Sequence, residues 1–394
     1  MSIDESQVTA AVAAVIDPEL RRPLGELGMV GSVHTRRKRV AVEVALPVAH
    51  YPQVDLLEAR VHQAVSAVAG ADEVTVGTVV MEEEPRARLR MLLRGEAVEG
   101  GTQHAPDDGH HHDHDHGGGG QLGHEEGRPN RFMLPRSKTR ILGISSGKGG
   151  VGKSSVTVNL AVALAGRGFD VGILDADVYG FSVPKMLGVT NDPLIIGDLV
   201  VPPTANGVRC LSMGYFVPDD TPVIWRGPML HKALEQFLVD AYWGEPDYLL
   251  IDMPPGTGDV TLSLGQYLTK TEVYVVTTPQ QAAERVAQRS AYAARKLKLA
   301  VRGVIENMSW FTGDDGTRYE LFGAGGGAQL AGELGVPLLA QVPLVPALRQ
   351  GGDDGIPTAS AEPHGEVAAI FDRLAASIVD LGPARVYRKE LSLS

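Results

Sequence analysis

Thiols are almost absent from this sequence, which holds one cysteine, Cys210, in 394 residues. No disulfide can form within the chain, which fits a reducing compartment. Long apolar runs are missing too, since no stretch approaches the roughly 18 apolar residues that a membrane span needs. Segment 1–20 lacks a basic flank followed by an apolar stretch, so it has no features of a secretory signal. We expect a cytoplasmic protein without a membrane span.

Basic residues are in the minority, because 36 Lys and Arg oppose 48 Asp and Glu and the net charge is -12. Binding to nucleic acid phosphates needs clustered Lys and Arg, so this balance speaks against nucleic acid as the main partner. Apolar residues make up 43% and charged residues 21%, which is typical of a globular protein with a sizeable core. The length favours two domains.

The first 95 residues predict a small α+β domain. Helical spacing covers 10–16 and 56–68, while 40–46 alternates apolar and polar residues as a strand does and 74–80 reads as a second strand. We therefore place the first domain at 1–95.

Residues 96–137 have the composition of a flexible linker, because the run 110–116 contains only His and Asp and four glycines follow it. Seven of the twelve histidines lie in this segment. Imidazoles without a fixed frame make unselective ligands, so we favour a solvated tether. Metal binding by the His-rich run is the alternative.

Beyond residue 138 short apolar runs alternate with segments of helical spacing. Runs of this kind are typical of strands buried on both faces of a parallel sheet; they are 141–145, 171–174, 248–251, 273–277, 301–305 and 338–342. The alternation predicts an α/β domain at 138–394 with a doubly wound, mostly parallel sheet.

A glycine-rich loop follows the first of these strands and precedes the helical run 156–165. Its spacing is that of the phosphate loop of nucleotide-binding proteins. The glycines let backbone N–H groups converge on phosphates, and the helix N-terminus adds positive potential. Lys153 is expected to reach the β- and γ-phosphates, and the Ser154 hydroxyl to ligate Mg²⁺. The predicted ATP-binding residues are Gly147, Lys148, Gly149, Gly150, Val151, Gly152, Lys153, Ser154 and Ser155.

Acidic residues follow two other predicted strands. Asp175 and Asp177 come just after one strand and Asp252 ends another, so their side chains are expected at the carboxyl edge of the sheet. One carboxylate of the first pair can orient the attacking water, while Asp252 is predicted on the magnesium side, followed by a nucleotide-sensing loop at 253–259. Taken singly, Asp252 could equally cap a helix.

Lys148, directly after the first glycine, adds a second cation to the loop. It is a candidate to neutralise charge that develops on the leaving phosphate. With this lysine, the loop resembles the deviant phosphate loop of the MinD and ParA class of dimerising ATPases. The resemblance implies a homodimer in which Lys148 acts across the nucleotide, and it favours Asp177 over Asp175 as the residue that positions water. Lys148, Lys153 and Asp177 are thus the predicted catalytic residues.

A closer resemblance covers most of 140–385. It is carried by 145–158, 174–180, 223–229, 252–259 and 306–309. These segments resemble the Mrp-type, or ApbC-like, ATPases, which carry iron-sulfur clusters to recipient apoproteins. The resemblance implies an ATP-hydrolysing cluster carrier with assembly proteins and apoproteins as partners. It also implies that Asn307 contacts the adenine base, although an asparagine there can instead form a turn.

The first domain resembles the small iron-sulfur assembly domain often fused ahead of these ATPases, through 17–20, 27–30 and 86–95. Family members usually carry a Cys-x-x-Cys pair after the segment that matches 306–309, and the small domain usually has a Cys-Pro. Here those places read 310–317, without cysteine, and Tyr51-Pro52. Cys210 is expected to be a buried apolar residue. The ligands of any cluster therefore stay unassigned.

Two other functions are compatible with these residues. One is a nucleotide-switched dimeric scaffold or regulator that holds no cluster of its own. The other is a ParA-like positioning role on DNA, which the acidic balance disfavours and which predicts salt-sensitive, ATP-dependent DNA binding.

Overall fold

The structure is a computed structural model, and it describes residues 4–36, 38–68, 73–95, 130–177, 180–216, 227–256 and 259–384. Contacts divide the chain into two compact units, one of 1–126 with 194–201 and one of 127–193 with 202–394. Of the predicted linker, 96–129 and its histidines lie outside the described residues. None of the described helices combines the length and apolar character that a membrane span requires.

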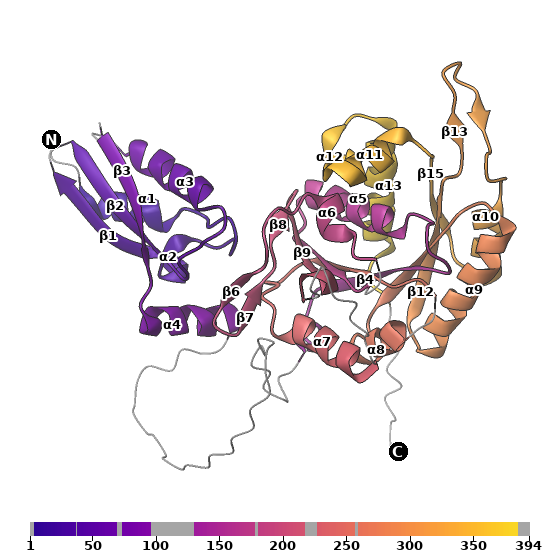
Figure 1. Ribbon diagram of the computed structural model, residues 1–394, viewed down its shortest axis with the longest axis horizontal. Helices are drawn as coiled ribbons and strands as arrows, with labels where there is room; N and C mark the ends of the chain where they lie inside the picture. The colour runs from indigo at the N-terminus through magenta and orange to yellow at the C-terminus, as the bar shows by residue number, and fades with distance from the viewer. Residues whose placement is uncertain are drawn as a thin grey trace, which may run out of the picture. The chain divides into compact units, whose positions relative to one another are not determined.

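The small unit is an α+β structure around a three-stranded sheet (Figure 1). The strands lie in the order β1-β2-β3, with β1 and β2 antiparallel and β2 and β3 parallel. Its elements are α1 (Glu5–Ala13), α2 (Leu24–Leu27), β1 (Val30–Arg36), β2 (Arg39–Leu46), α3 (Val54–Ser66), β3 (Glu73–Val80) and α4 (Glu83–Arg94).

Strand β2 forms as the apolar alternation predicts, because Val40, Val42, Val44 and Leu46 are buried between more exposed neighbours. Helix α1 begins and ends earlier than predicted. The Asp4 carboxylate accepts the N–H of Ser6 at 2.9 Å, which caps the helix ahead of its apolar residues.

A short hairpin from the middle of the chain also belongs to the small unit. It consists of β6 (Leu194–Ile196) and β7 (Leu199–Val201), which pair antiparallel. Arg94 of α4 forms an ion pair of 2.5 Å with Asp198 at the turn. Gly197 lies against Arg90 at a φ of +66°, so a side chain there would meet the guanidinium.

The large unit is built on an eight-stranded sheet in the order β15-β12-β11-β4-β10-β5-β9-β8. All neighbours are parallel except β8 and β9. The strands are β4 (Arg140–Ser146), β5 (Val171–Asp175), β8 (Thr204–Ala205), β9 (Val208–Ser212), β10 (Tyr248–Asp252), β11 (Glu272–Thr277), β12 (Ala300–Asn307) and β15 (Leu338–Val342). The predicted doubly wound, mostly parallel sheet is confirmed.

Helices cover both faces of this sheet (Figure 1). On β11, Tyr274 and Val276 join the core beneath α5 and α13, while Val273 and Val275 point to the core beneath α9 and α10. The helices are α5 (Lys153–Gly166), α6 (Val183–Leu187), α7 (Gly227–Val239), α8 (Asp259–Tyr267), α9 (Gln281–Lys296), α10 (Gly326–Leu334), α11 (Pro346–Asp354), α12 (Thr358–Ala361) and α13 (Glu366–Leu381), with short 3₁₀ turns at Arg131–Met133 and Met213–Phe216.

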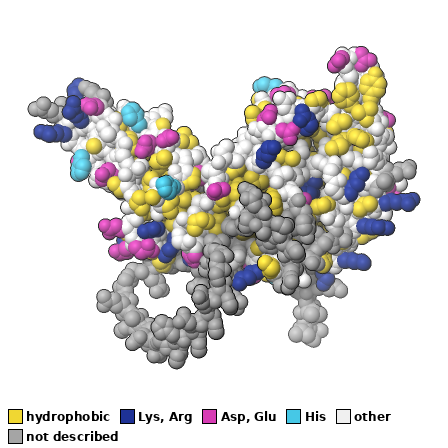
Figure 2. Space-filling model, in the orientation of Figure 1, with side chains coloured by type: hydrophobic (Ala, Val, Ile, Leu, Met, Phe, Trp, Pro, Cys, Tyr) yellow, Lys and Arg dark blue, Asp and Glu magenta, His cyan; other side chains and the backbone are white. Residues whose placement is uncertain are grey.

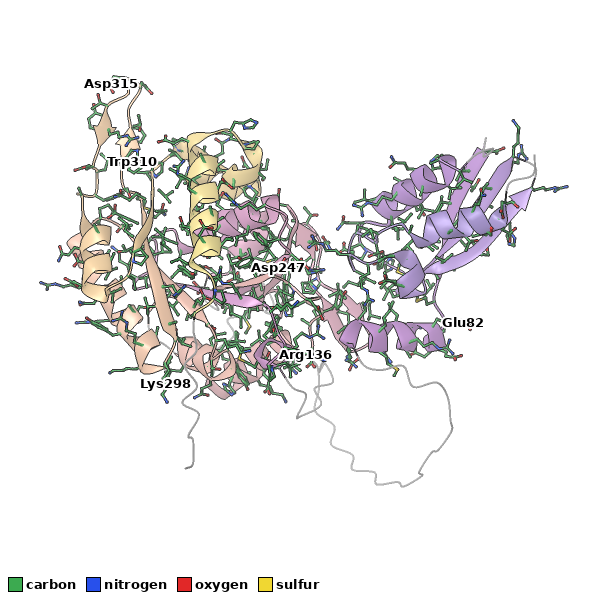
Figure 3. The ribbon with its side chains drawn as sticks, turned by 180° about the vertical axis from the view of Figure 1, so that it is seen from behind. Glu82, Arg136, Asp247, Lys298, Trp310 and Asp315 are labelled. Atoms are coloured by element: carbon green, nitrogen blue, oxygen red, sulfur yellow. The ribbon has the colours of Figure 1, made fainter. Side chains whose placement is uncertain are left out.

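Two surface features of the large unit are visible in the figures. Lys and Arg side chains gather over the edge formed by α9, whose Arg285, Arg289 and Lys296 are exposed (Figure 2). A small hairpin of β13 (Phe311–Thr312) and β14 (Arg318–Tyr319) projects outward, with Asp315 near its tip (Figure 3). The negative net charge is therefore not spread evenly over the surface.

Candidate nucleotide-binding site

The predicted phosphate loop joins the end of β4 to the start of α5. Gly150 and Gly152 have φ of +78° and +79°, a left-handed conformation that favours glycine. Gly152 is the N-cap of α5, so the free N–H groups of this helix face the loop. Because β4 lies between β10 and β11, the loop opens at the crevice where chain connections diverge to either side.

Asp252, at the end of β10, holds three side chains of α5 together. Its Oδ2 accepts hydrogen bonds from the Lys153 ammonium and from the Ser154 hydroxyl, both at 2.6 Å. Its Oδ1 accepts the Thr157 hydroxyl at 2.7 Å. Asp252 is fully buried, so the Lys153 charge compensates a carboxylate that burial would otherwise destabilise.

The two aspartates after β5 differ in their surroundings. Asp175 is fully buried and accepts the N–H of Asp177 at 3.2 Å and the Ser212 hydroxyl at 3.0 Å. Burial, with the nearby Asp252, raises the pKa of Asp175 to about 7. Asp177 instead lines the pocket, and its Oδ2 lies 3.8 Å from the Lys153 nitrogen. This placement is compatible with the predicted water-positioning role of Asp177. Asp175 instead holds the backbone of Asp177 in place through the hydrogen bond from its N–H.

Lys148 extends from the loop toward the start of α9. Its ammonium donates to the side-chain oxygen of Gln280, the N-cap residue of α9, at 3.3 Å. A side chain at Gly147 would meet the backbone of α9 only 2.2 Å from the Ala287 nitrogen. The loop is therefore packed directly on α9, and Gly147 permits that approach.

Asn307 ends β12 and supports the loop from below. Its Nδ2 donates to the carbonyl of Val151 at 2.9 Å, and a side chain at Gly152 would lie 2.2 Å from that nitrogen. The structure thus gives Asn307 a loop-supporting contact, while its predicted contact with adenine stays a prediction.

The loop borders a pocket of about 240 Å³. Of the predicted residues, those that line it are Lys148, Gly149, Gly150, Gly152, Lys153, Ser154, Ser155 and Asp177; Gly147, Val151, Asp252 and Asn307 lie behind this lining. Sequence reasoning missed Thr157 and Gln280, whose contacts with Asp252 and Lys148 depend on tertiary pairing. It also missed the lining residues Ser182 and Met186, whereas the lining residue Pro255 belongs to the predicted nucleotide-sensing loop.

The donor set at this pocket fits a nucleotide with Mg²⁺. The Ser154 hydroxyl and the Asp252 carboxylate are hard oxygen ligands in direct contact, which suits Mg²⁺ better than softer metals. A cation and a row of glycines beside them suit the phosphates. Of the predicted nucleotide-sensing loop at 253–259, residues 257–258 lie outside the described residues. The rest is tied to the phosphate loop, because the N–H of Gly256 donates to the carbonyl of Ser146 at 2.9 Å.

Comparison with known proteins agrees with this geometry. Residues 137–379 match the family described as NUBPL iron-transfer P-loop NTPase. The chain belongs to this family. Residues 5–76 match a second family, described as iron-sulfur cluster assembly protein. The fused arrangement predicted from the sequence is therefore confirmed.

Relatives share almost the whole length of the chain. An "Iron-sulfur cluster carrier protein" of Mycobacterium leprae is 43% identical, over 97% of each chain. A protein of the same description from Synechocystis is 36% identical, over 94% of this chain and 96% of its own. Among solved structures, a nucleotide-binding protein of Archaeoglobus fulgidus in complex with ADP is 33% identical, with a TM-score of 0.51, over 59% of this chain and 93% of its own.

The family resemblance implies cysteine ligands at two places in the chain, and neither place holds a cysteine. The segment 310–317, for which the family resemblance implies a cysteine pair, contains β13 and leads into β14. The Arg318 guanidinium lies over the Trp310 ring, 4.5 Å from its centroid. Tyr51, at the other expected place, is buried and donates its hydroxyl to Asp17 at 2.8 Å. Cys210 is fully buried on β9, as predicted.

Proposed function

We propose that this protein is an ATP-hydrolysing carrier that delivers iron-sulfur clusters to recipient apoproteins. The contact of Lys153 and Ser154 with one buried carboxylate oxygen of Asp252 supports the ATPase half, because it gathers the phosphate cation and both magnesium ligands at one edge of the sheet. Full-length relatives described as cluster carriers support the second half.

Each side chain has a separate role in this proposal. Lys153 binds the phosphates, and Ser154 and Asp252 hold Mg²⁺, which when bound neutralises phosphate charge. Asp177 holds the attacking water. Lys148 leaves Gln280 and neutralises the charge that develops during phosphoryl transfer, across a homodimer.

Removing Lys153 and removing Lys148, one at a time, should affect different steps, ATP binding and ATP hydrolysis. We expect Lys153→Ala to weaken ATP binding about 10- to 100-fold, since hydrogen bonds to charged groups are each worth about 1.5–3 kcal/mol. Lys148→Ala is expected to bind ATP nearly as well as the unaltered protein and to hydrolyse it slowly. Titration with a fluorescent ATP analogue and phosphate release measure the two effects.

Unchanged phosphate release in Lys148→Ala would remove the role of that residue in turnover. Tight ATP binding in Lys153→Ala would show that the phosphates lie elsewhere. Arg349→Ala is a suitable control, because among the described residues this exposed side chain pairs only with Asp353 of its own helix, α11.

A further inference from the structure

Any cluster on this protein needs ligands, and the chain offers very few soft ones. Iron-sulfur clusters are held by cysteine thiolates, and even the variant type with histidines keeps a pair of cysteines. The 394 residues contain one cysteine. Two copies of the chain would therefore bring too few thiolates unless both cysteines met at the cluster.

The position of Cys210 prevents such a meeting. It lies in the middle of β9, between β5 and β8, opposite Ile173 of β5. Its side chain is fully buried in the apolar core under α5. Burial, together with the carboxylates of Asp175 and Asp252, raises the pKa of its thiol, so the thiolate needed for iron is disfavoured.

Other side chains do not replace the missing thiolates. Among the described residues no three His, Cys, Asp or Glu side chains come together as a metal site. Carboxylate oxygens, such as those of Asp314 and Asp315 on the β13–β14 hairpin, are hard donors that suit magnesium or calcium rather than the iron of a cluster. Since the one cysteine of the chain is fully buried, the thiolates of a cluster would then come from another molecule.

We infer that this protein carries its cluster as a complex in which a partner molecule supplies the thiolate ligands. The inference rests on the proposed carrier function and names the chemistry of its partner, a thiol-bearing peptide segment or a low-mass thiol. The cluster arrives with its thiolates and keeps them while bound, so no bond to sulfur changes and no electron is transferred. ATP binding and hydrolysis then control when the complex forms and releases.

Two probes distinguish the sources of the thiolates. Full-length protein is incubated anaerobically with Mg²⁺ and ATP and with a preformed [4Fe-4S] cluster, ligated either by glutathione or by a peptide that contains one Cys-x-x-Cys pair. Gel filtration then measures iron, sulfide and thiol probe in the protein fraction. We expect iron to elute with at least one of the two thiol probes, in the ratio that the free complex has. Retention with only one probe identifies that source.

Cys210→Ala and Cys210→Val provide the decisive comparison, because both remove the thiol and the valine refills the core. Melting temperatures identify a variant that fails to fold, and the other variant then serves. Equal iron retention by the unaltered protein and a folded variant supports the inference. Three results would overturn the inference. Iron could stay with the protein while the thiol probe is lost, iron retention could disappear with Cys210, or neither probe could lead to retention.

A second experiment distinguishes failure of the proposed carrier function from failure of the inference. Delivery from a cluster-loaded cysteine protein to an apoprotein is followed with and without ATP, for the unaltered chain and both variants. If ATP stimulates delivery by the unaltered chain but not by the folded variants, the carrier function stands and the inference is wrong. If ATP stimulates delivery by none of them, the carrier function itself fails.

Discussion

Asp175 and Asp177 stand two residues apart and have different surroundings. Only Asp177 lines the pocket, while Asp175 accepts hydrogen bonds from Ser212 and from the backbone of Asp177. The sequence placed both at the edge of the sheet but could not separate them, because the difference comes from Ser212 on another strand. A resemblance favoured Asp177, and its place in the pocket is compatible with that choice.

Asp177→Ala should bind ATP and hydrolyse it slowly. Removing a group that positions or activates water costs about 10²- to 10⁴-fold in rate. Single-turnover hydrolysis measures the rate, and filter binding measures the bound ATP. Fast hydrolysis in the variant would assign the role to another residue.

The buried Asp175 carboxyl should make the stability of the ligand-free protein depend on pH. Its pKa is about 7 in the fold and near 3.8 in an unfolded chain, so the native state holds its proton more tightly. Its contribution to stability is therefore lost as pH rises from about 4 through 7. Asp175→Asn should reduce this loss. Urea midpoints at pH 5 and pH 8 test this, and parallel profiles for both proteins would contradict it.

Among the secondary-structure elements, the strands of the large sheet were the easiest to predict. β4, β5, β10 and β11 are short apolar runs buried on both faces, so composition alone marks them. β12 and the edge strand β15 were predicted in the same way, but β12 is only partly buried at its start and β15 is buried only at Val342. The β6–β7 and β13–β14 hairpins were missed, because strands of two or three residues carry no clear periodicity. Their pairing depends on neighbours that sequence spacing does not reveal.

The loop from β4 to α5 depends on backbone shape as well as on side chains. Gly152→Ala would hold alanine at a φ of +79° and press its Cβ on Asn307. We expect the free energy of unfolding to fall by about 1–3 kcal/mol, the usual cost of a strained backbone. Urea denaturation measures it. Gly149→Ala is the matched control in the same loop, since a Cβ there meets open space and its φ is not positive. Equal stability of the two variants would show that the loop relaxes.

At the scale of the whole molecule, a nucleotide pocket and an assembly-type unit share one chain, and the chain has almost no thiols. The family and the fold could be predicted because motifs mark them. The cluster ligands could not, because the cysteines that usually mark them are replaced. We therefore expect nucleotide turnover to regulate a complex with partners. Helix α9 adjoins the nucleotide pocket, because its N-cap residue Gln280 contacts Lys148 and its backbone packs on the phosphate loop at Gly147.

The most direct test follows reactivation of an apoprotein that needs a [4Fe-4S] cluster, with cluster-loaded thiol donor and catalytic amounts of this protein. The comparison is between ATP, no nucleotide, and ATP with Lys148→Ala, which should still bind nucleotide. We predict that reactivation requires ATP and slows in the variant in proportion to its loss of phosphate release. Reactivation at the same rate with and without ATP would contradict the account.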